Sequence, residues 1–253
     1  MDAGQFLCYG SRTTRLQADY VARGMAVLGY DAVNIAGWDL FLGEKFLKGL
    51  EDKYRLPFVS ANIRYKETGT RFARPYIVKR YGGRTFLGFR YGGIKVGVFG
   101  IASPEGVKRI KPQKEDRPLM VDEPLEAAHQ VMKGLKGRCH LVIMLTDLEV
   151  NQSRELATKV EGIDLIIGGR TGSVEKEPEK VAETYLAVVG NKGWYAGDLT
   201  FSLGSEGRFN SLETHSQLLD DKIEDDQRIL ELIQELKEKQ KGLRPKKIEG
   251  SKL

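Results

Sequence analysis

Two glycines followed by an arginine stand at the end of a strongly predicted strand, and they are the residues most suggestive of chemistry. The stretch Gly162–Gly172 holds a run of Leu and Ile, then Gly168 and Gly169, then Arg170 and Thr171. A short aliphatic run bounded by glycines is typical of a strand buried on both faces of a parallel sheet. The glycines can turn the backbone and place Arg170 at the C-terminal edge of the sheet, where open α/β sheets hold their sites. A guanidinium there could bind an anion, or the glycines only end the strand and Arg170 is a solvated loop residue.

The cysteines and histidines predict neither a disulfide framework nor a zinc site. Cys8 and Cys139 lie far apart, and no Cys-x-x-Cys pair occurs. The three histidines, His129, His140 and His215, fall in a predicted helix, at a predicted strand start and in a late surface segment. Lone histidines in such positions are more often structural than ligands.

Length and composition indicate a globular protein with one large α/β domain, or one domain and a tail. The chain has 253 residues, of which 41% are hydrophobic and 30% charged, with a net charge of +5. The basic excess is conspicuous in Lys237–Lys252 and is not interleaved with aromatics, so nucleic-acid binding is not indicated. No signal peptide and no apolar run long enough to span a membrane is found. Met1–Leu7 is typical of a strand end and the loop after it, as if a leader and a first strand had been removed.

Helix-period and strand-period segments alternate along the chain, which favours a layered α/β sheet. Amphipathic helices are predicted over residues 13–28, 44–55, 124–136, 152–159 and 220–241. Strands are predicted over residues 31–35, 57–61, 76–80, 85–90, 94–101, 140–145, 163–167, 184–189, 198–203 and 208–213. A polar loop is expected from residue 103 to about 120. We divide the chain into a domain over residues 1–215 and a C-terminal helix with a basic tail over residues 216–253.

Two Arg-Tyr-Gly-Gly tetrapeptides separate the three β-rich runs in the middle of the chain. Their glycine pairs are Gly82-Gly83 and Gly92-Gly93. Paired glycines between β-rich runs are hairpin signals, so a three-stranded meander is predicted.

Five segments in the right order and spacing together resemble the catalytic domain of the 5′-nucleotidase/UDP-sugar hydrolase branch of the calcineurin-like metallophosphoesterases. They are Gly29–Val33, Leu56–Asn62, Gly93–Gly100, Glu126–Ala128 and Gly162–Gly169. The resemblance runs from about Asp2 to Leu203 and implies a four-layer α/β/β/α sandwich with a two-metal site at the C-terminal ends of the strands. The first strand of that fold would precede residue 1. The second domain that supplies the nucleoside clamp in these nucleotidases has no counterpart in the chain.

The resemblance also implies where the metal ligands should be, and the residues found there are different. The first ligand motif, Asp-x-His, would precede residue 1, and the bridging Asp falls on Gln5. The Gly-Asn-His-Glu motif aligns with Ala36–Asp39, so its ligand Asn is replaced by Gly37 and its catalytic His by Trp38. We expect the Trp38 ring to be largely shielded and to fill the space vacated by metal and substrate.

The last two ligand motifs have also lost their imidazoles. The His of a Ser-His-Leu-Gly motif aligns with Asp147, and the Gly-His-x-His pair aligns with Arg170 and Gly172. Asp39 and Asp147 remain as weak candidates for a single cation such as Mg²⁺, because two acids without a third ligand seldom fix a metal. Cys8 lies three residues after Gln5 and could face the same edge, although no Lys or His lies close in sequence to lower its pKa.

These replacements predict a degenerate and inactive site in a binding or scaffold domain, with no cofactor. The alternative is a phosphoester hydrolase, of the nucleotide type, that uses Gln5, Asp39 and Asp147 with Mg, Mn or Zn. The expected partner is a phosphate-type anion at Arg170 or another protein. The location of the protein is left open: the resemblance implies a periplasmic or extracytoplasmic place if a leader was removed.

Overall fold

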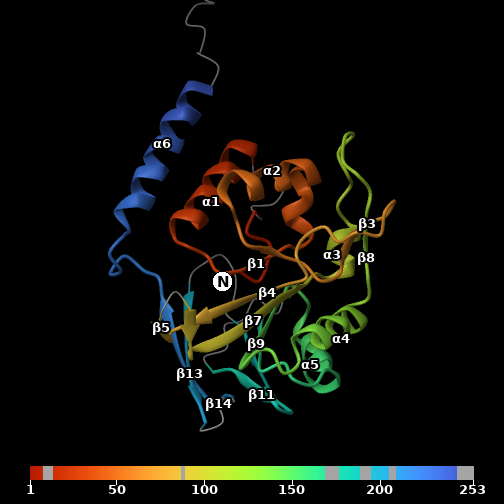
Figure 1. The fold of residues 1–253 in the computed structure, drawn as a ribbon. Coiled ribbons are helices and arrows are strands. Elements are labelled where there is room, and N and C mark those ends of the chain that lie inside the picture. The colour runs from red at the N-terminus through yellow and green to blue at the C-terminus, as the bar shows by residue number, and fades with distance from the viewer. Residues whose placement is uncertain (8–13, 87–88, 169–176, 189–194, 205–208, 244–253) are drawn as a thin grey trace, which may run out of the picture.

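The computed structural model describes the chain except for residues 8–13, 87–88, 169–176, 189–194, 205–208 and 244–253 (Figure 1). No helix of the described part is both long and apolar enough to cross a membrane.

A mixed six-stranded sheet forms the centre of the molecule. Its strands, in spatial order, are β11 (Glu179–Val181), β12 (Thr184–Ala187), β10 (Leu165–Gly168), β9 (Leu141–Thr146), β7 (Ile94–Ile101) and β4 (Tyr76–Tyr81). The four inner strands are parallel to one another, whereas the edge strands β11 and β4 pair antiparallel with β12 and β7. All six residues of β9 are buried, as expected for its run of five apolar residues followed by Thr146.

A second β layer packs on one face of this sheet. It contains the parallel pair β1 (Val33–Asn34) and β2 (Phe58–Val59) and the antiparallel pair β13 (Tyr195–Leu203) and β14 (Phe209–Leu218). Asp2 forms an isolated parallel bridge with Val33, as expected for a strand end. The core between the layers contains Ala32, which directly precedes β1, and buried side chains of β2, β7, β9, β10 and β12, with partly buried ones from β13 and β14.

Helices cover both outer faces, so the predicted four-layer α/β/β/α arrangement is confirmed. On one side α1 (Arg15–Val27) and α2 (Glu44–Tyr54) pack on β1 and β2 (Figure 1). On the other, α4 (Pro124–Leu135) and α5 (Val150–Lys159) pack on the six-stranded sheet. Helix α1 begins at a capping box between Thr14 and Gln17 and ends before Gly29, whose φ of 68° suits a residue without a Cβ.

The last helix, α6 (Gln227–Leu243), lies against α1. Leu232 is buried there, and Arg23 Nη1 lies 2.7 Å from Glu235 Oε2. The helix begins later than residue 220 because the Asp226 carboxylate accepts a hydrogen bond from the backbone N–H of Arg228, as a cap does. Strand β14 continues to Leu218, past the boundary that we drew at residue 215.

The predicted three-stranded meander is wrong. Strand β4 pairs with β7, and a separate hairpin of β5 (Arg84–Phe86) and β6 (Phe89–Tyr91) is inserted between them. The two Gly-Gly turns lie side by side: a Cβ on Gly93 would be 2.6 Å from the carbonyl oxygen of Tyr81. Both turns therefore belong to one long antiparallel ribbon.

The expected loop between residues 103 and 120 contains two elements, so that prediction is also wrong. Helix α3 (Pro104–Lys108) follows Ser103, and β8 (Leu119–Val121) pairs antiparallel with β3 (Ile63–Tyr65). Residues 37–42, between β1 and α2, form a short 3₁₀ helix, η1 (Gly37–Leu42).

Candidate functional site

Gln5 and Asp147 meet at the C-terminal edge of the six-stranded sheet. Asp147 directly follows β9, and its side chain is buried. Gln5 Nε2 donates a hydrogen bond to Asp147 Oδ2 over 3.2 Å. The resemblance implied that these two positions belong to one site, and the structure brings them together through a neutral amide.

Asp39 is fully buried and binds the backbone of the N-terminal loop. Its Oδ2 accepts hydrogen bonds from the N–H groups of Gln5 and Ala36, each at 2.9 Å, and its Oδ1 accepts one from Leu7 at 3.1 Å. Burial raises the pKa of Asp39 to about 7, although the three N–H donors act in the opposite direction; the charge of Asp2 adds to the increase. Both carboxylate oxygens are therefore occupied by the protein itself.

Helix α3 packs where η1 begins, and it leaves no room for a side chain at position 37. A Cβ on Gly37 would lie 2.3 Å from the backbone carbonyl atoms of Gly106. The N–H of Ser103, at the cap of α3, donates to Asp147 Oδ1 over 2.6 Å. An asparagine ligand at position 37 could not be accommodated unless α3 moved.

The remaining predicted site residues are placed as follows. Trp38 is partly buried, and its ring contacts that of Phe41, with the centroids 6.0 Å apart. Arg170, Gly172 and Cys8 lie outside the described residues.

The histidines lie where the sequence placed them. His129 is exposed on α4 and His215 is exposed on β14. His140, just before β9, accepts a hydrogen bond at Nδ1 from the N–H of Lys95 over 2.9 Å. Within the described part of the chain, no group of three or more His, Cys, Asp or Glu residues is arranged to hold a metal.

The described donor set does not fit the dinuclear centre that the resemblance implies. Such a centre needs bridging and terminal ligands that converge on two cations. The Asp39 oxygens accept three backbone N–H bonds, and the Asp147 oxygens accept hydrogen bonds from Ser103 and Gln5. The bridging position holds the amide of Gln5, whose NH₂ group faces a carboxylate.

Sequence reasoning missed Ser103, although a signal was present. Its side chain accepts a hydrogen bond from the N–H of Gly106, and Pro104 occupies the first helical position. Ser followed by Pro is a helix-start signal. That signal could have found the helix that fills this edge of the sheet.

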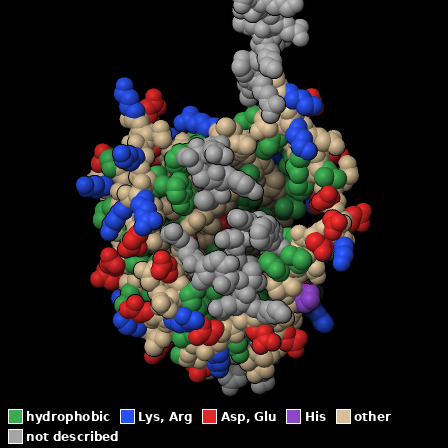
Figure 2. Space-filling view, turned by 180° about the vertical axis from the view of Figure 1, so that it is seen from behind, with side chains coloured by type: hydrophobic (Ala, Val, Ile, Leu, Met, Phe, Trp, Pro, Cys, Tyr) green, Lys and Arg blue, Asp and Glu red, His purple; other side chains and the backbone are tan. Residues whose placement is uncertain are grey.

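Charge does not single out a ligand on the face opposite to that of Figure 1. Figure 2 shows Lys and Arg interspersed with Asp and Glu among the described residues of that face. Local geometry, and not the overall field, must therefore identify any binding site there.

Comparison with known proteins agrees with the fold. No family model matches the chain. The trifunctional nucleotide phosphoesterase protein YfkN of Bacillus subtilis is 30% identical over 120 residues, which is 46% of this chain but 8% of YfkN. The chain therefore spans a small part of that relative.

Solved structures share the architecture over nearly the whole chain. Sulfate thiohydrolase SoxB of Thermus thermophilus is 19% identical, with a TM-score of 0.79 and coverage of 95% of this chain and 42% of SoxB. The calcineurin-like phosphoesterase YfkN has a TM-score of 0.76 at 19% identity, covering 94% of this chain and 82% of that structure. A 5′-nucleotidase precursor from Thermus thermophilus has a TM-score of 0.74 at 20% identity, covering 96% of this chain and 49% of that structure. The chain thus has the calcineurin-like metallophosphoesterase fold, as the sequence resemblance predicted.

Proposed function

We propose that this chain is a metallophosphoesterase-fold domain that does not hydrolyse phosphoesters and acts as a binding or scaffold domain. The observation that carries the proposal is the hydrogen bonding of the Asp39 and Asp147 carboxylates. Their oxygens accept hydrogen bonds from the protein's own backbone and from Gln5. A carboxylate has about four lone-pair sites, and each hydrogen bond accepted within the chain takes up one that a cation would otherwise use.

The tight packing of α3 supports the same proposal. Gly37 replaces the asparagine ligand, and the Gly106 backbone occupies the space that its side chain would need. A single substitution at position 37 would therefore not restore the ligand, because the packing of α3 against Gly37 leaves no space for an asparagine side chain.

The second candidate is a metal-dependent phosphoester hydrolase with non-standard ligands. It is favoured by the proximity of Gln5 and Asp147 and by the names of the similar proteins, which include a nucleotide phosphoesterase and a 5′-nucleotidase. In this candidate the side chains of Gln5 and Asp147 would have to exchange their mutual hydrogen bond for a cation.

Hydrolysis assays separate the two candidates. We expect the protein, with added Mn²⁺ or Mg²⁺, to release no product above the blank from bis(p-nitrophenyl) phosphate or 5′-AMP. Gln5→Asp, which restores the bridging carboxylate, should also stay inactive because Gly37 and α3 are unchanged. Metal-dependent turnover that is lost in Asp147→Asn would instead establish the hydrolase.

A further inference from the structure

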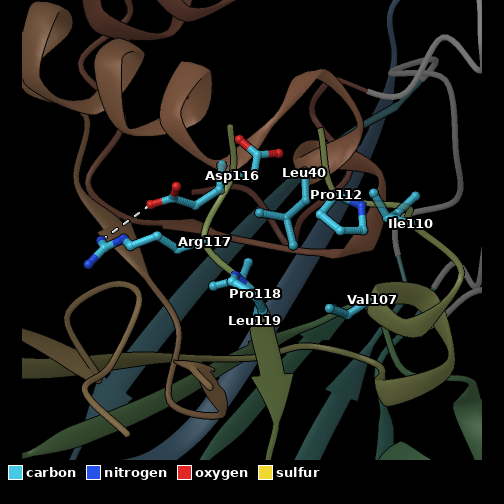
Figure 3. Close-up of a pocket in the computed structure, with 9 residues that line it drawn as sticks. Leu40, Val107, Ile110, Pro112, Asp116, Arg117, Pro118 and Leu119 are labelled. Atoms are coloured by element: carbon cyan, nitrogen blue, oxygen red, sulfur yellow. Dashed lines mark hydrogen bonds and ion pairs between the residues drawn. The ribbon is translucent and has the colours of Figure 1, made fainter. Parts of the chain in front are cut away.

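A pocket with a volume of about 120 Å³ lies between η1, the start of α2, α3 and the segment that leads into β8 (Figure 3). Its walls are largely apolar and are formed by Leu40, Val107, Ile110, Pro112, Pro118 and Leu119. Leu40 and Val107 are buried, whereas Pro112 and Pro118 are exposed. The pocket therefore has a buried floor and an open mouth.

Glu44, the first residue of α2, is one of the residues that line the pocket, and only one of its two carboxylate oxygens has a partner among the described residues. Its side chain is 4% exposed. Oε1 accepts a hydrogen bond from the Tyr65 hydroxyl over 2.5 Å and lies 3.5 Å from Arg117 Nη2. Oε2 is buried and has no hydrogen-bond partner among the described residues. A buried carboxylate oxygen without a partner among the described residues is costly, so a donor that reached it would be stabilised there.

The two neighbours of Glu44 hold it in place without satisfying Oε2. Burial and the hydrogen bond to Glu44 raise the pKa of Tyr65 to about 12, so the hydroxyl remains a donor to Oε1. The Arg117 guanidinium stacks on the Tyr65 ring, with its carbon 3.5 Å from the ring centroid, and is about half exposed. A dashed line at the labelled Arg117 in Figure 3 marks its ion pair, which joins Nη2 to Glu44 Oε1.

The charges of the lining favour a cation. Asp116 also lines the pocket, and its carboxylate is bonded by the neutral N–H groups of Gln113, at 2.8 Å, and Lys45, at 3.3 Å. The lining thus holds two carboxylates, those of Glu44 and Asp116, and one guanidinium, that of Arg117. A metal ion would find too few oxygen ligands among the apolar walls, and an anion would be repelled by Glu44.

We propose that this pocket binds a small organic cation, a primary ammonium on a short branched aliphatic body. The ammonium would donate to Glu44 Oε2, and the aliphatic part would contact Leu40 and Val107. About 120 Å³ corresponds to about four waters at about 30 Å³ each, so about four non-hydrogen atoms fit inside the pocket and the remainder of a six-atom ligand would lie in its open mouth. The proposal is independent of whether the edge near Gln5 hydrolyses anything.

The test uses 3-methylbutylamine and its neutral analogue 3-methylbutan-1-ol on the intact protein, followed by NMR. We expect saturable shifts of the Leu40 and Val107 methyl groups, a dissociation constant of about 1 mM for the amine, and binding of the alcohol at least tenfold weaker. Equal affinity for the two, or no shift of these methyl groups, would overturn the proposal and leave the pocket to water.

Variants of two glutamates on the same helix complete the test. Glu44→Gln keeps the shape and an acceptor for Tyr65 but removes the charge, and it should weaken amine binding at least tenfold. The matched control is Glu51→Gln, because Glu51 pairs with Lys48 at 2.5 Å and does not line the pocket. Unchanged binding in a folded Glu44→Gln would contradict the assignment; if that variant does not fold, the comparison of amine and alcohol on the parent protein decides.

Discussion

Asp39 and Glu44 are two buried carboxylates close together in sequence, yet their hydrogen bonding differs. Both oxygens of Asp39 accept backbone N–H groups, whereas Glu44 Oε2 has no partner among the described residues. The first joins the N-terminal loop to η1, and the second belongs to a residue that lines a pocket. A buried carboxylate in this fold therefore indicates a binding site only if its oxygens are not already bonded within the chain.

Replacement of Asp39 should change the stability of the protein more than any other variant considered for these two carboxylates. Asp39→Ala leaves three N–H donors unpaired, and we expect a loss of about 5 kcal/mol in the free energy of unfolding, at about 1–3 kcal/mol for each donor. Urea denaturation measures it. The control is Asp31→Ala, because Asp31 is 41% exposed and pairs with Lys79, so its loss should cost less than about 1 kcal/mol. Equal effects of the two variants would show that the Asp39 hydrogen bonds are not structural.

A pH titration of stability should show the next largest effect. The pKa of Asp39 is raised from 3.8 to about 7, so between these values the folded protein holds a proton that the unfolded chain has released. The contribution of Asp39 is greatest below about pH 4 and is lost as the pH rises to about 7, by about 4 kcal/mol at about 1.4 kcal/mol per pH unit. Urea midpoints of the protein and of Asp39→Asn should therefore differ in slope over this range and run parallel above it. Parallel curves throughout would contradict the raised pKa.

The smallest expected effect concerns the charge of the ligand that binds near Arg170 and of the ligand that binds near Glu44. Arg170 was predicted to bind phosphate-type anions, whereas Glu44 should bind a cation. We expect phosphate to bind with a dissociation constant of about 1 mM or weaker and to lose affinity as salt is added. Thermal shifts with phosphate should shrink in Arg170→Ala and persist in Glu44→Gln. An identical response of all three proteins would make Arg170 an ordinary loop residue.

Much of the fold could be predicted because its signals are local. Aliphatic runs bounded by glycines, such as Ile163–Gly168, and the stripe before Gly29 specify strands and helices without knowledge of their partners. The hairpin β5–β6 could not be separated from its neighbours, because two equal Gly-Gly turns do not reveal which strands pair. The pairing of β4 with β7 is decided by tertiary contacts.

The position of the candidate site could be predicted from the sequence, but the hydrogen-bond partners of its residues could not. Gln5 and Asp147 meet because the ends of parallel strands share one edge of the sheet. The partners of Asp39 are backbone groups, and backbone N–H groups leave no trace in a sequence. Glu44 was missed for a related reason, since Tyr65 and Arg117 reach it from other elements.

The metal content of the protein tests the central claim most directly. The protein would be purified without chelator, analysed for Mn, Zn and Fe, and melted with and without EDTA. Because the oxygens of Asp39 and Asp147 already accept hydrogen bonds within the chain, we expect no stoichiometric metal and the same melting temperature in both samples. One or more equivalents of any of these metals, or a melting temperature lowered by several degrees with EDTA, would contradict the account.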